Sequence, residues 1–588
     1  MSLRDGIQFV SSIDPRIDIN NLHNKMYAIL KSGNRANYWQ FPLQGTPGAA
    51  TQLNWNATVP DESTYVNRRC YVNLTGTITF QGASAGAGQT LLQCRGYNAA
   101  AGVSVGNANF DALRCLPLSQ LFQNFNVTLN NNAITQNLGL YSRIFQRFQR
   151  TYKDQNLDLS MSPASPDMSL EYSDLFGSYL DPLNVYGTQQ YDPRGAFTGI
   201  TVTSNTSLGA NDTATVTFNI TEPFWLSPFA WDQNDEPVSL QGIRNFNVSA
   251  QLGGRGNSAI AGAAGSMWSH STAVGAGTIT GAQVAITSGT LFLSYISPPP
   301  DQFLPRNIYY SWVNPTYYQQ TVGGANAGVQ IRQNSQTIQL DSVPARMYIW
   351  VEKADFLQDM TKTDTTGFRI DNIAIRWDTV ASILNDATSQ DLYQMSVRNG
   401  CNITWNQWNG CRVPDPSTPG ATLPSGLGSI LCCNFGLDIP LVDGQAPGVT
   451  GKHTLQVTVT ATNITGGNIP TASVNILICE EGVMNINNGN IQFSTGIVTT
   501  ADYKSVDQMV PISHMPSKNI LGGAFWDDVK AFISRAGPGV FRAIKSVLPG
   551  VVQNAGEAVL QAYGKGLGRV KGGAMLTGPQ LAQLEYHK

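Results

Sequence analysis

The sequence predicts an all-β protein in which two β-domains follow one another and a short α-helical tail ends the chain. Charged residues are only 13 % of the 588 residues, and Gly, Asn, Thr and Ser are abundant, as suits short strands and many turns. A proline-rich stretch interrupts the chain near its middle, and similar patterns recur in the same order on both sides of it. We therefore expect a duplicated β-domain.

The proline-rich stretch runs from Ser297 to Pro305. Proline fixes φ and lacks a backbone N–H, so neither a helix nor a central strand continues through it. We expect a stiff extended linker at 298–306, between a first domain at 46–297 and a second domain at 307–499. Within the second domain, the stretch 401–426 contains prolines and two tryptophans, and we expect a loop there.

Two pairs of patterns repeat across this linker. A short strand followed by a run of helical period is predicted at 125–148 and again at 373–393. Later in each half, the motifs that begin at Leu226 and Leu437 precede a strand in which apolar and polar residues alternate. The alternative is that alternating strands look alike in any all-β protein. The apolar residues expected in the core of these two strands are Phe246, Val248, Leu455 and Val457.

Three further segments complete the predicted order. Residues 1–45 form an N-terminal arm, in which a short helix is expected to run through 27–30. The polar segment 153–197 indicates a long surface loop inserted in the first domain. The helical run at 141–148 has arginines beside its apolar face, and we expect a solvated face that covers the end of a sandwich. These arginines are Arg143, Arg147 and Arg150.

Residues 500–523 form a second linker, and 524–588 form a basic tail with helical periodicity. From Lys518 onward there is an excess of five positive charges, in a chain of net charge −3. Two short amphipathic helices are predicted. Their apolar face consists of Phe525, Trp526, Val529, Phe532, Ile533, Val540, Phe541, Ile544, Val547 and Leu548. The basic residues expected to face a polyanion such as DNA are Lys530, Arg535, Arg542, Lys545, Lys565, Arg569 and Lys571.

The motifs do not indicate an enzyme, a cofactor or a metal site. The eight cysteines mostly lie in apolar strands, which indicates buried thiols, and no His or Cys pair has metal-ligand spacing. Gly82-Ala-Ser84-Ala-Gly86 matches the nucleophile-elbow string but no helix start follows it. No secretion signal and no apolar run of membrane-spanning length is visible, so we expect synthesis in a reducing compartment.

Several motifs in a fixed order resemble the double jelly-roll major capsid proteins of DNA viruses, of the type found in polinton-like viruses, virophages and adintoviruses. They are Leu116-Pro-Leu-Ser-Gln-Leu-Phe with Val127-Thr-Leu-Asn-Asn, Leu340-Asp-Ser-Val-Pro-Ala-Arg-Met-Tyr-Ile, Leu392-Tyr-Gln-Met-Ser with Asn399-Gly400, and Gly436-Leu-Asp-Ile-Pro-Leu. The resemblance covers about 45–498 of the chain. It implies two upright jelly rolls per chain, hexon-like homotrimers of pseudo-hexagonal outline, and an icosahedral shell of the virion made inside the host cell. Neighbouring capsomers and penton or minor capsid proteins are the implied partners.

The resemblance also implies a fate for the tail. Ile520-Leu-Gly-Gly523-Ala524 resembles the hydrophobic-x-Gly-Gly-x site of adenovirus-type maturation proteases, and the site that ends in Gly573-Ala574 is a poorer match. We expect the tail to act inside the shell, on packaged DNA or a lipid surface, and to be removed at maturation. The alternative is a permanent helical appendage on the second domain.

Three rival functions share parts of this pattern. A secreted β-sandwich adhesin or lectin has the same composition but needs a secretion signal. An RNA-virus shell protein would show one jelly roll and a strongly basic arm. A β-sandwich glycosidase needs paired carboxylates, and nothing in the sequence pairs Asp235, Glu236 and Asp438.

Overall fold

The computed structural model describes residues 8–496 with internal gaps. The gaps are 13–26, 32–34, 46–51, 61–63, 69, 84–90, 93–111, 115, 150–199, 206–212, 224–225, 230–238, 254–266, 270–277, 298–306, 355–365, 415–421, 426–427, 443–444, 465–467 and 488. The linker at 298–306, the insertion at 153–197 and the whole tail therefore lie outside the described residues.

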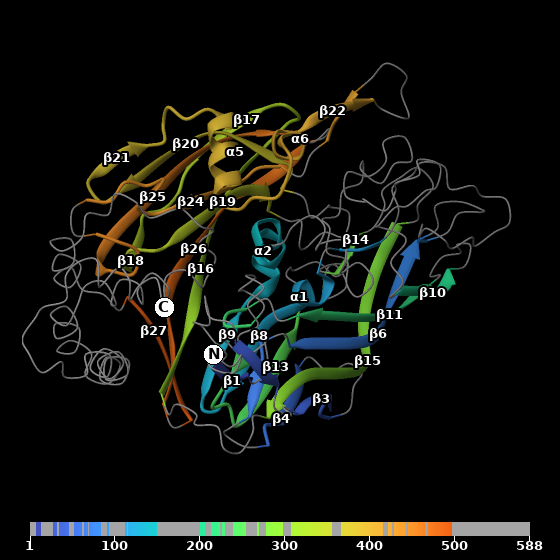
Figure 1. Cartoon of the computed structure of the whole chain (residues 1–588). Coiled ribbons are helices and arrows are strands. Elements are labelled where there is room, and N and C mark those ends of the chain that lie inside the picture. Colours follow the sequence, from blue (N-terminus) through green and yellow to red (C-terminus); the bar gives the residue numbers. More distant parts are fainter. Residues whose placement is uncertain are drawn as a thin grey trace, which may run out of the picture.

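The first domain consists of two antiparallel sheets, which lie at the lower right of Figure 1. One sheet has the order β10 (Ile200–Asn205), β11 (Thr213–Pro223), β6 (Tyr71–Ala83), β15 (Thr278–Ser297), β5 (Tyr65–Asn67), β12 (Ser239–Leu240), with β3 (Arg35–Pro42) along β15. The other has the order β4 (Gln52–Thr58), β13 (Asn245–Leu252), β8 (Phe122–Leu129), β9 (Asn132–Gln136). Smaller elements are β7 (Ala112–Leu113), β14 (Trp268–Ser269), α1 (Pro117–Leu121), η2 (Leu138–Leu140) and α2 (Ser142–Gln149).

The second domain, at the upper left of Figure 1, again has two antiparallel sheets. One has the order β16 (Asn307–Ala325), β26 (Ile469–Asn487), β19 (Arg346–Lys353), β24 (Ile430–Asn434), with β27 (Asn490–Thr495) along β26. The other has the order β17 (Gln330–Asn334), β25 (Thr450–Asn463), β20 (Phe368–Trp377), β21 (Val380–Ile383), with β18 (Ile338–Ser342) along β25. Smaller elements are α5 (Ser389–Arg398), α6 (Trp405–Asn409), β22 (Cys411–Pro414) and β23 (Thr422–Ser425).

The two domains match strand by strand. The larger sheet of the first domain contains β3-β15-β6-β11 as neighbours, and its counterpart is β16-β26-β19-β24. The order β4-β13-β8-β9 corresponds to β17-β25-β20-β21. Two sheets of four such strands, connected in this order, are the arrangement of a jelly roll. The described residues therefore support the predicted duplication of a β-domain.

The alternating pattern that predicted the core is confirmed. In β13, Phe246 and Val248 are buried, and in β25, Leu455 and Val457 are buried. Their polar neighbours face outward because successive side chains of a strand point to opposite faces of the sheet. Each of these strands lies inside its sheet, β13 between β4 and β8, and β25 between β20 and the strands β17 and β18.

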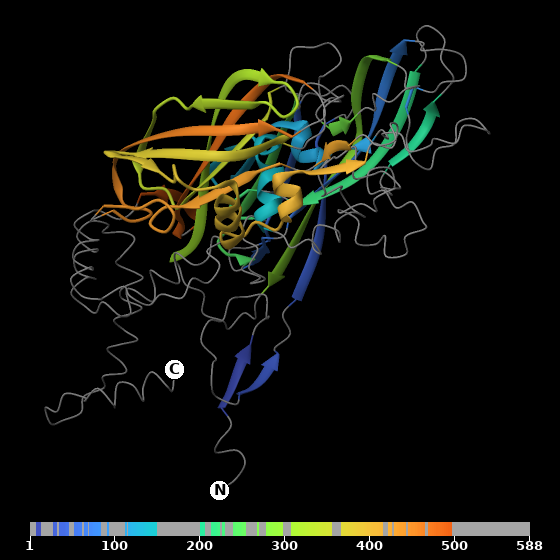
Figure 2. The same ribbon diagram turned by 90° about the horizontal axis from the view of Figure 1, so that it is seen from above.

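Two local predictions are wrong. Residues 27–31 form a strand, β2 (Tyr27–Lys31), which pairs in parallel with β1 (Gln8–Ser12), instead of a capped helix. Figure 2 shows these two strands projecting from the body of the molecule. The segment 401–426, expected to be a loop, contains α6 and the hairpin β22–β23. The described residues include no helix that is both long and apolar enough to cross a membrane.

Candidate assembly surfaces

Helix α2 of the first domain packs against the second domain. Its apolar residues Ile144, Phe145 and Phe148 are buried, as their helical spacing predicted. The rings of Phe145 and Phe148 meet the ring of Tyr348 edge-on, with centroids 5.2 and 5.0 Å apart. Tyr348 lies in β19, every residue of which is buried. Strand β19 therefore has the core of its own domain on one face and the first domain on the other.

A buried ion pair joins the same two elements. Arg143 of α2 donates a hydrogen bond to Glu352 Oε2 at the end of β19, and the two side chains are 1 % and 4 % exposed. The indole Nε1 of Trp350 donates to the same oxygen at 3.0 Å. A buried carboxylate needs such partners because transfer out of water disfavours its charge.

The prediction that this helix has a solvated face is therefore wrong. Arg143 and Arg147 are 1 % and 2 % exposed, and the backbone N–H of Asn402 donates to the carbonyl of Arg147 at 2.9 Å. The second domain covers the face that we predicted to be solvated. The residue pattern at 141–148 could not predict this, because the covering residues are far away in the sequence. The side chain of Arg150 lies outside the described residues.

A second contact is formed by the tight turn between β8 and β9. Asn130 Nδ2 donates to the carbonyl of Gly489 at 2.5 Å, and Asn131 Nδ2 donates to Asn490 Oδ1 at 2.9 Å. Asn130 has a φ of 54°, a left-handed conformation that asparagine tolerates better than most residues. The turn thereby presents its amides to the start of β27 in the second domain.

A third contact surrounds Tyr310 of β16. Its hydroxyl donates to the carbonyl of Ser239 at 3.1 Å and accepts from the backbone N–H of Gln241 at 2.8 Å. The guanidinium of Arg68 lies 5.3 Å from the centre of the Tyr310 ring, a cation–π geometry. Strand β12 and the residues next to it in the first domain thus enclose an aromatic residue on the first strand of the second domain.

The described residues buried at this interface include the Cys432 thiol and the Tyr348 phenol. Burial raises the pKa of the Cys432 thiol to about 12 and holds the pKa of Tyr348 well above its ordinary value. A thiol with a raised pKa stays protonated and is a poor nucleophile. The predicted buried thiols are confirmed for Cys70, Cys432, Cys433 and Cys479.

A small cavity lies beside Glu222, whose carboxylate accepts hydrogen bonds from the backbone N–H groups of Leu118 and Ser119 at 2.8 and 2.9 Å. Phe122 and Phe125 are among the residues that line the cavity, which has a volume of about 10 Å³. That volume holds roughly one water, whereas ligand pockets measure roughly 300–1,000 Å³. The cavity is therefore a packing defect and not a substrate site.

The other predicted chemical groups divide into two sets. Ser84, Asp235, Glu236, both Gly-Gly sites and all the named tail residues lie outside the described residues. Asp438 is described, and its carboxylate accepts hydrogen bonds from Arg398 and from Asn399 Nδ2, so it has a structural role. Within the described ranges, no group of three or more His, Cys, Asp or Glu side chains could hold a metal ion.

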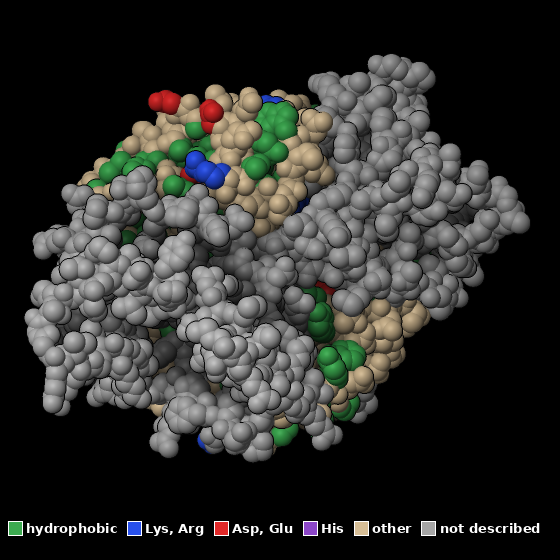
Figure 3. All heavy atoms as spheres, viewed as in Figure 1, with side chains coloured by type: hydrophobic (Ala, Val, Ile, Leu, Met, Phe, Trp, Pro, Cys, Tyr) green, Lys and Arg blue, Asp and Glu red, His purple; other side chains and the backbone are tan. Residues whose placement is uncertain are grey.

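Exposed hydrophobic residues are a surface feature that the sequence did not single out. Figure 3 shows hydrophobic side chains gathered on the surface of the second domain, in the region of α5 and α6. The large exposed hydrophobic residues of the described part are Tyr38, Trp39, Val329, Val397, Leu437 and Val442. Most of them lie in turns or on the edge strand β3, where apolar residues have no regular spacing, and Val397 lies on helix α5.

Two family models match the chain, one in each half. Residues 7–296 match the first domain of the Sputnik virophage major capsid protein. Residues 313–482 match the C-terminal domain of the major capsid protein V20. The two matched segments thus lie on either side of the proline-rich stretch.

Whole-chain relatives agree with these matches. A Sputnik virophage protein named as capsid protein V20 is 27 % identical over 620 aligned positions, which cover 99 % of this chain and 98 % of the relative. The cryo-EM structure of the Sputnik virophage superposes with a TM-score of 0.70 at 25 % identity, covering 87 % of this chain and 97 % of that chain. The mavirus major capsid protein superposes with a TM-score of 0.60 at 12 % identity, covering 81 % and 93 %, and this likeness shows the fold alone.

These findings support the capsid function over the secreted adhesin or lectin. Both halves match capsid protein models, and the strand order in both halves is that of a jelly roll. The chain therefore belongs to the double jelly-roll major capsid proteins of the virophages, which are structural proteins and not enzymes, and whose copies build the icosahedral shell of the virion.

Proposed function

We propose that the chain assembles into homotrimers of pseudo-hexagonal outline, and that these trimers are the building blocks of the shell. Three chains with two similar domains each present six similar domains around one axis. The observation that supports this proposal is that both domains have the same strand order and are joined by a buried interface. A rigid pair of equivalent domains is the unit that such a ring requires.

Native mass spectrometry of the purified full-length chain tests this proposal. We expect a species of three chains, and negative-stain images with hexagonal outlines. A chain that remains monomeric at micromolar concentrations would contradict the proposed trimer.

We further propose the division of the chain into an arm at 1–45, jelly rolls at 46–297 and 307–499, linkers at 298–306 and 500–523, and a tail at 524–588. The tail would act inside the shell, through its basic residues on packaged DNA or through its apolar face on an internal or host membrane. Helices as short as those predicted are marginal alone in water, which supports a binding role. Penton or minor capsid proteins and a maturation protease are the other proposed partners.

The proposed cleavage lies between Gly523 and Ala524, with the weaker site between Gly573 and Ala574. Glycines there leave the backbone adaptable and let a narrow protease groove close on it. Intact-mass measurement of the coat protein from mature particles tests the proposal. A chain ending at Gly523 is the expected product, and one still ending at Lys588 would refute the cleavage.

A further inference from the structure

The two domains contribute different elements to the contact between them. The first domain contributes α2 and the segment between β11 and β13, while the second contributes its first strand β16 and the outer face of β19. Ser227, in the segment between β11 and β13, accepts a hydrogen bond from the backbone N–H of Val313 in β16 at 2.9 Å. One end of the first domain therefore docks on one face of the second.

Both sides of this contact have counterparts in the opposite domains, because the strand orders match. The counterpart of α2 is α5, and the counterpart of the segment between β11 and β13 is the segment 435–449 between β24 and β25. The counterpart of β16 is β3. A second contact of the same kind would thus join α5 and 435–449 to β3.

Exposed hydrophobic side chains mark these counterparts. Val397 of α5 is 39 % exposed, and Leu437 and Val442 in the segment 435–449 are 55 % and 50 % exposed. We call these three residues the docking face. In the first domain the equivalent elements bury their apolar residues, since Phe145 and Phe148 of α2 are buried and Leu226 is fully buried.

The strand β3 shows the same contrast. Tyr38 and Trp39 are 77 % and 47 % exposed, whereas Tyr310 on the corresponding strand β16 is 7 % exposed under the first domain. Within the described residues β3 pairs with β15 alone, so its outer edge is open. We call β3 with Tyr38 and Trp39 the acceptor strand. An open edge with exposed aromatic residues is typical of a strand that another surface covers.

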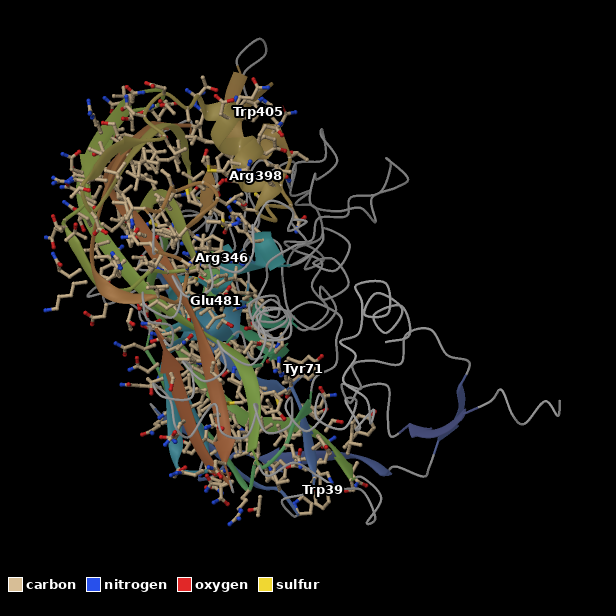
Figure 4. The ribbon with its side chains drawn as sticks, turned by 60° about the vertical axis from the view of Figure 1, so that its left-hand side comes forward. Trp39, Tyr71, Arg346, Arg398, Trp405 and Glu481 are labelled. Carbon is tan, nitrogen blue, oxygen red and sulfur yellow. The ribbon has the colours of Figure 1, made fainter. Side chains whose placement is uncertain are left out.

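The two surfaces cannot meet within one chain. Figure 4 shows Trp39 at one end of the molecule, and Arg398, the neighbour of Val397, at the opposite end. Figure 1 agrees, with α5 at the top of the second domain and β3 at the bottom of the first. A contact between them therefore needs a second copy, and it is head-to-tail.

We propose that the docking face of one copy binds the acceptor strand of a second copy, and so repeats between chains the contact that joins the two domains within a chain. The inference rests on the proposed trimer and names the surface that closes it. A head-to-tail contact closes into a ring when its rotation matches the ring symmetry. A second copy fits this surface because, in the equivalent contact within the chain, Tyr310 of the first strand is enclosed by the neighbouring domain.

The side chains on both surfaces are of the kinds that stabilise contacts between subunits. Tyrosine and tryptophan each bury roughly 150–250 Å² when fully covered, and they are enriched among the residues that dominate binding. Arg398, 56 % exposed and paired with the buried Asp438, lies beside the docking face and fits a polar rim.

Two single variants of the full-length chain test the two sides separately. Leu437→Asp places a charge on the docking face, and Trp39→Asp places one on the acceptor strand. Both residues are exposed, so we expect unchanged melting temperatures for the isolated chains. In native mass spectrometry we expect the trimer fraction of each variant to fall about tenfold or more, because a charge at a central apolar contact weakens it strongly. Val329→Asp is the matched control, 48 % exposed but outside both surfaces, and should remain trimeric.

Mixing the two disrupted variants adds a test of complementarity. The Trp39→Asp chain retains its docking face and the Leu437→Asp chain retains its acceptor strand, so one intact contact forms per pair. We expect heterodimers and no closed trimers. A mixture that stays monomeric, or variants that remain fully trimeric alone, would overturn the proposed surfaces and leave the trimer itself intact. A wild-type chain that never forms trimers would instead refute the proposed function together with this inference.

Discussion

At the scale of single residues, alternation along a strand determined which side chains form the core. Leu455 is fully buried between the two sheets of the second domain, whereas Thr458, three positions later, lies on the half-buried opposite face of β25. The same rule separates Phe246 from Asn247 in β13. The hydrophobic effect fixes these positions because each sheet has one face turned to a core.

Truncation of these core residues gives the first prediction. Leu455→Ala or Phe246→Ala should lower the free energy of unfolding by about 2–5 kcal/mol, through lost burial and the cavity left behind. Denaturant unfolding of the variants measures it. Thr458→Ala is the control on the same strand and should change stability by less than about 1 kcal/mol. Equal effects at Leu455 and Thr458 would mean that the observed strand register is wrong.

The buried pair Arg143–Glu352 gives the second prediction. Arg143→Ala leaves the Glu352 carboxylate buried with its charge uncompensated, and the cost should be about 3–5 kcal/mol in unfolding free energy. The measurement is again denaturant unfolding at neutral pH.

A double variant separates the pair from the packing of its atoms. Arg143→Met with Glu352→Gln removes both charges, while the glutamine oxygen still accepts from Trp350 Nε1. This variant should be clearly more stable than Arg143→Ala, because replacing both partners avoids the orphaned charge. A double variant as unstable as Arg143→Ala would show that shape, not charge, sets the cost.

At the scale of elements, the turn between β20 and β21 depends on one carboxylate. Asp378 accepts hydrogen bonds from the backbone N–H of Thr454 at 2.8 Å and from Gln445 Nε2 at 3.2 Å, and lies 2.8 Å from His453 Nδ1. Burial alone would raise the pKa of Asp378, but the hydrogen bonds from His453 and Thr454 outweigh it and the pKa is lowered. The ionised carboxylate therefore stabilises the turn.

Asp378→Asn gives the third prediction, since asparagine keeps the shape and tolerates the φ of 51° at this position. A lowered pKa means that the stabilisation is fully present above the ordinary value of 3.8 and is lost as the pH falls through the folded value. The variant should be less stable than the wild type at pH 7, and the difference should shrink below about pH 4. Unfolding measured from pH 7 to pH 3 checks this. A difference that is constant over that range would exclude a contribution from the charge.

Elements with a strong local period could be predicted from the sequence, and others could not. The strands that include Phe246 and Leu455 and the helical run at 141–148 have unambiguous apolar spacing. The short helix α6 was missed although Thr404 and Gln407 form a capping box, because Trp405 and the prolines further on indicated a loop. The strand β2 was missed because its pairing with β1 is set by a partner some twenty residues away.

At the scale of the whole molecule, the duplication was visible in the sequence but the contact between the copies was not. The order of motifs around Leu226 and Leu437 predicted two equivalent domains. The pairs that join those domains, such as Arg143 with Glu352 and Asn130 with Gly489, span up to 359 positions of the sequence and leave no local periodic signal. The candidate assembly surfaces became visible only when exposure could be compared between equivalent elements.

We expect the interface to make the two jelly rolls one cooperative unit. Residues of β19 belong to the core of the second domain and also pack against α2 of the first, so unfolding of either domain exposes apolar surface of the other. We therefore predict a single transition in calorimetry of the trimer-deficient Leu437→Asp chain, with equal van't Hoff and calorimetric enthalpies. Tyr348→Ala removes the ring that Phe145 and Phe148 share, and should lower the van't Hoff enthalpy below the calorimetric one. Two resolved transitions in the Leu437→Asp chain, which keeps Tyr348, would show that the domains fold independently and that their contact is not a rigid joint.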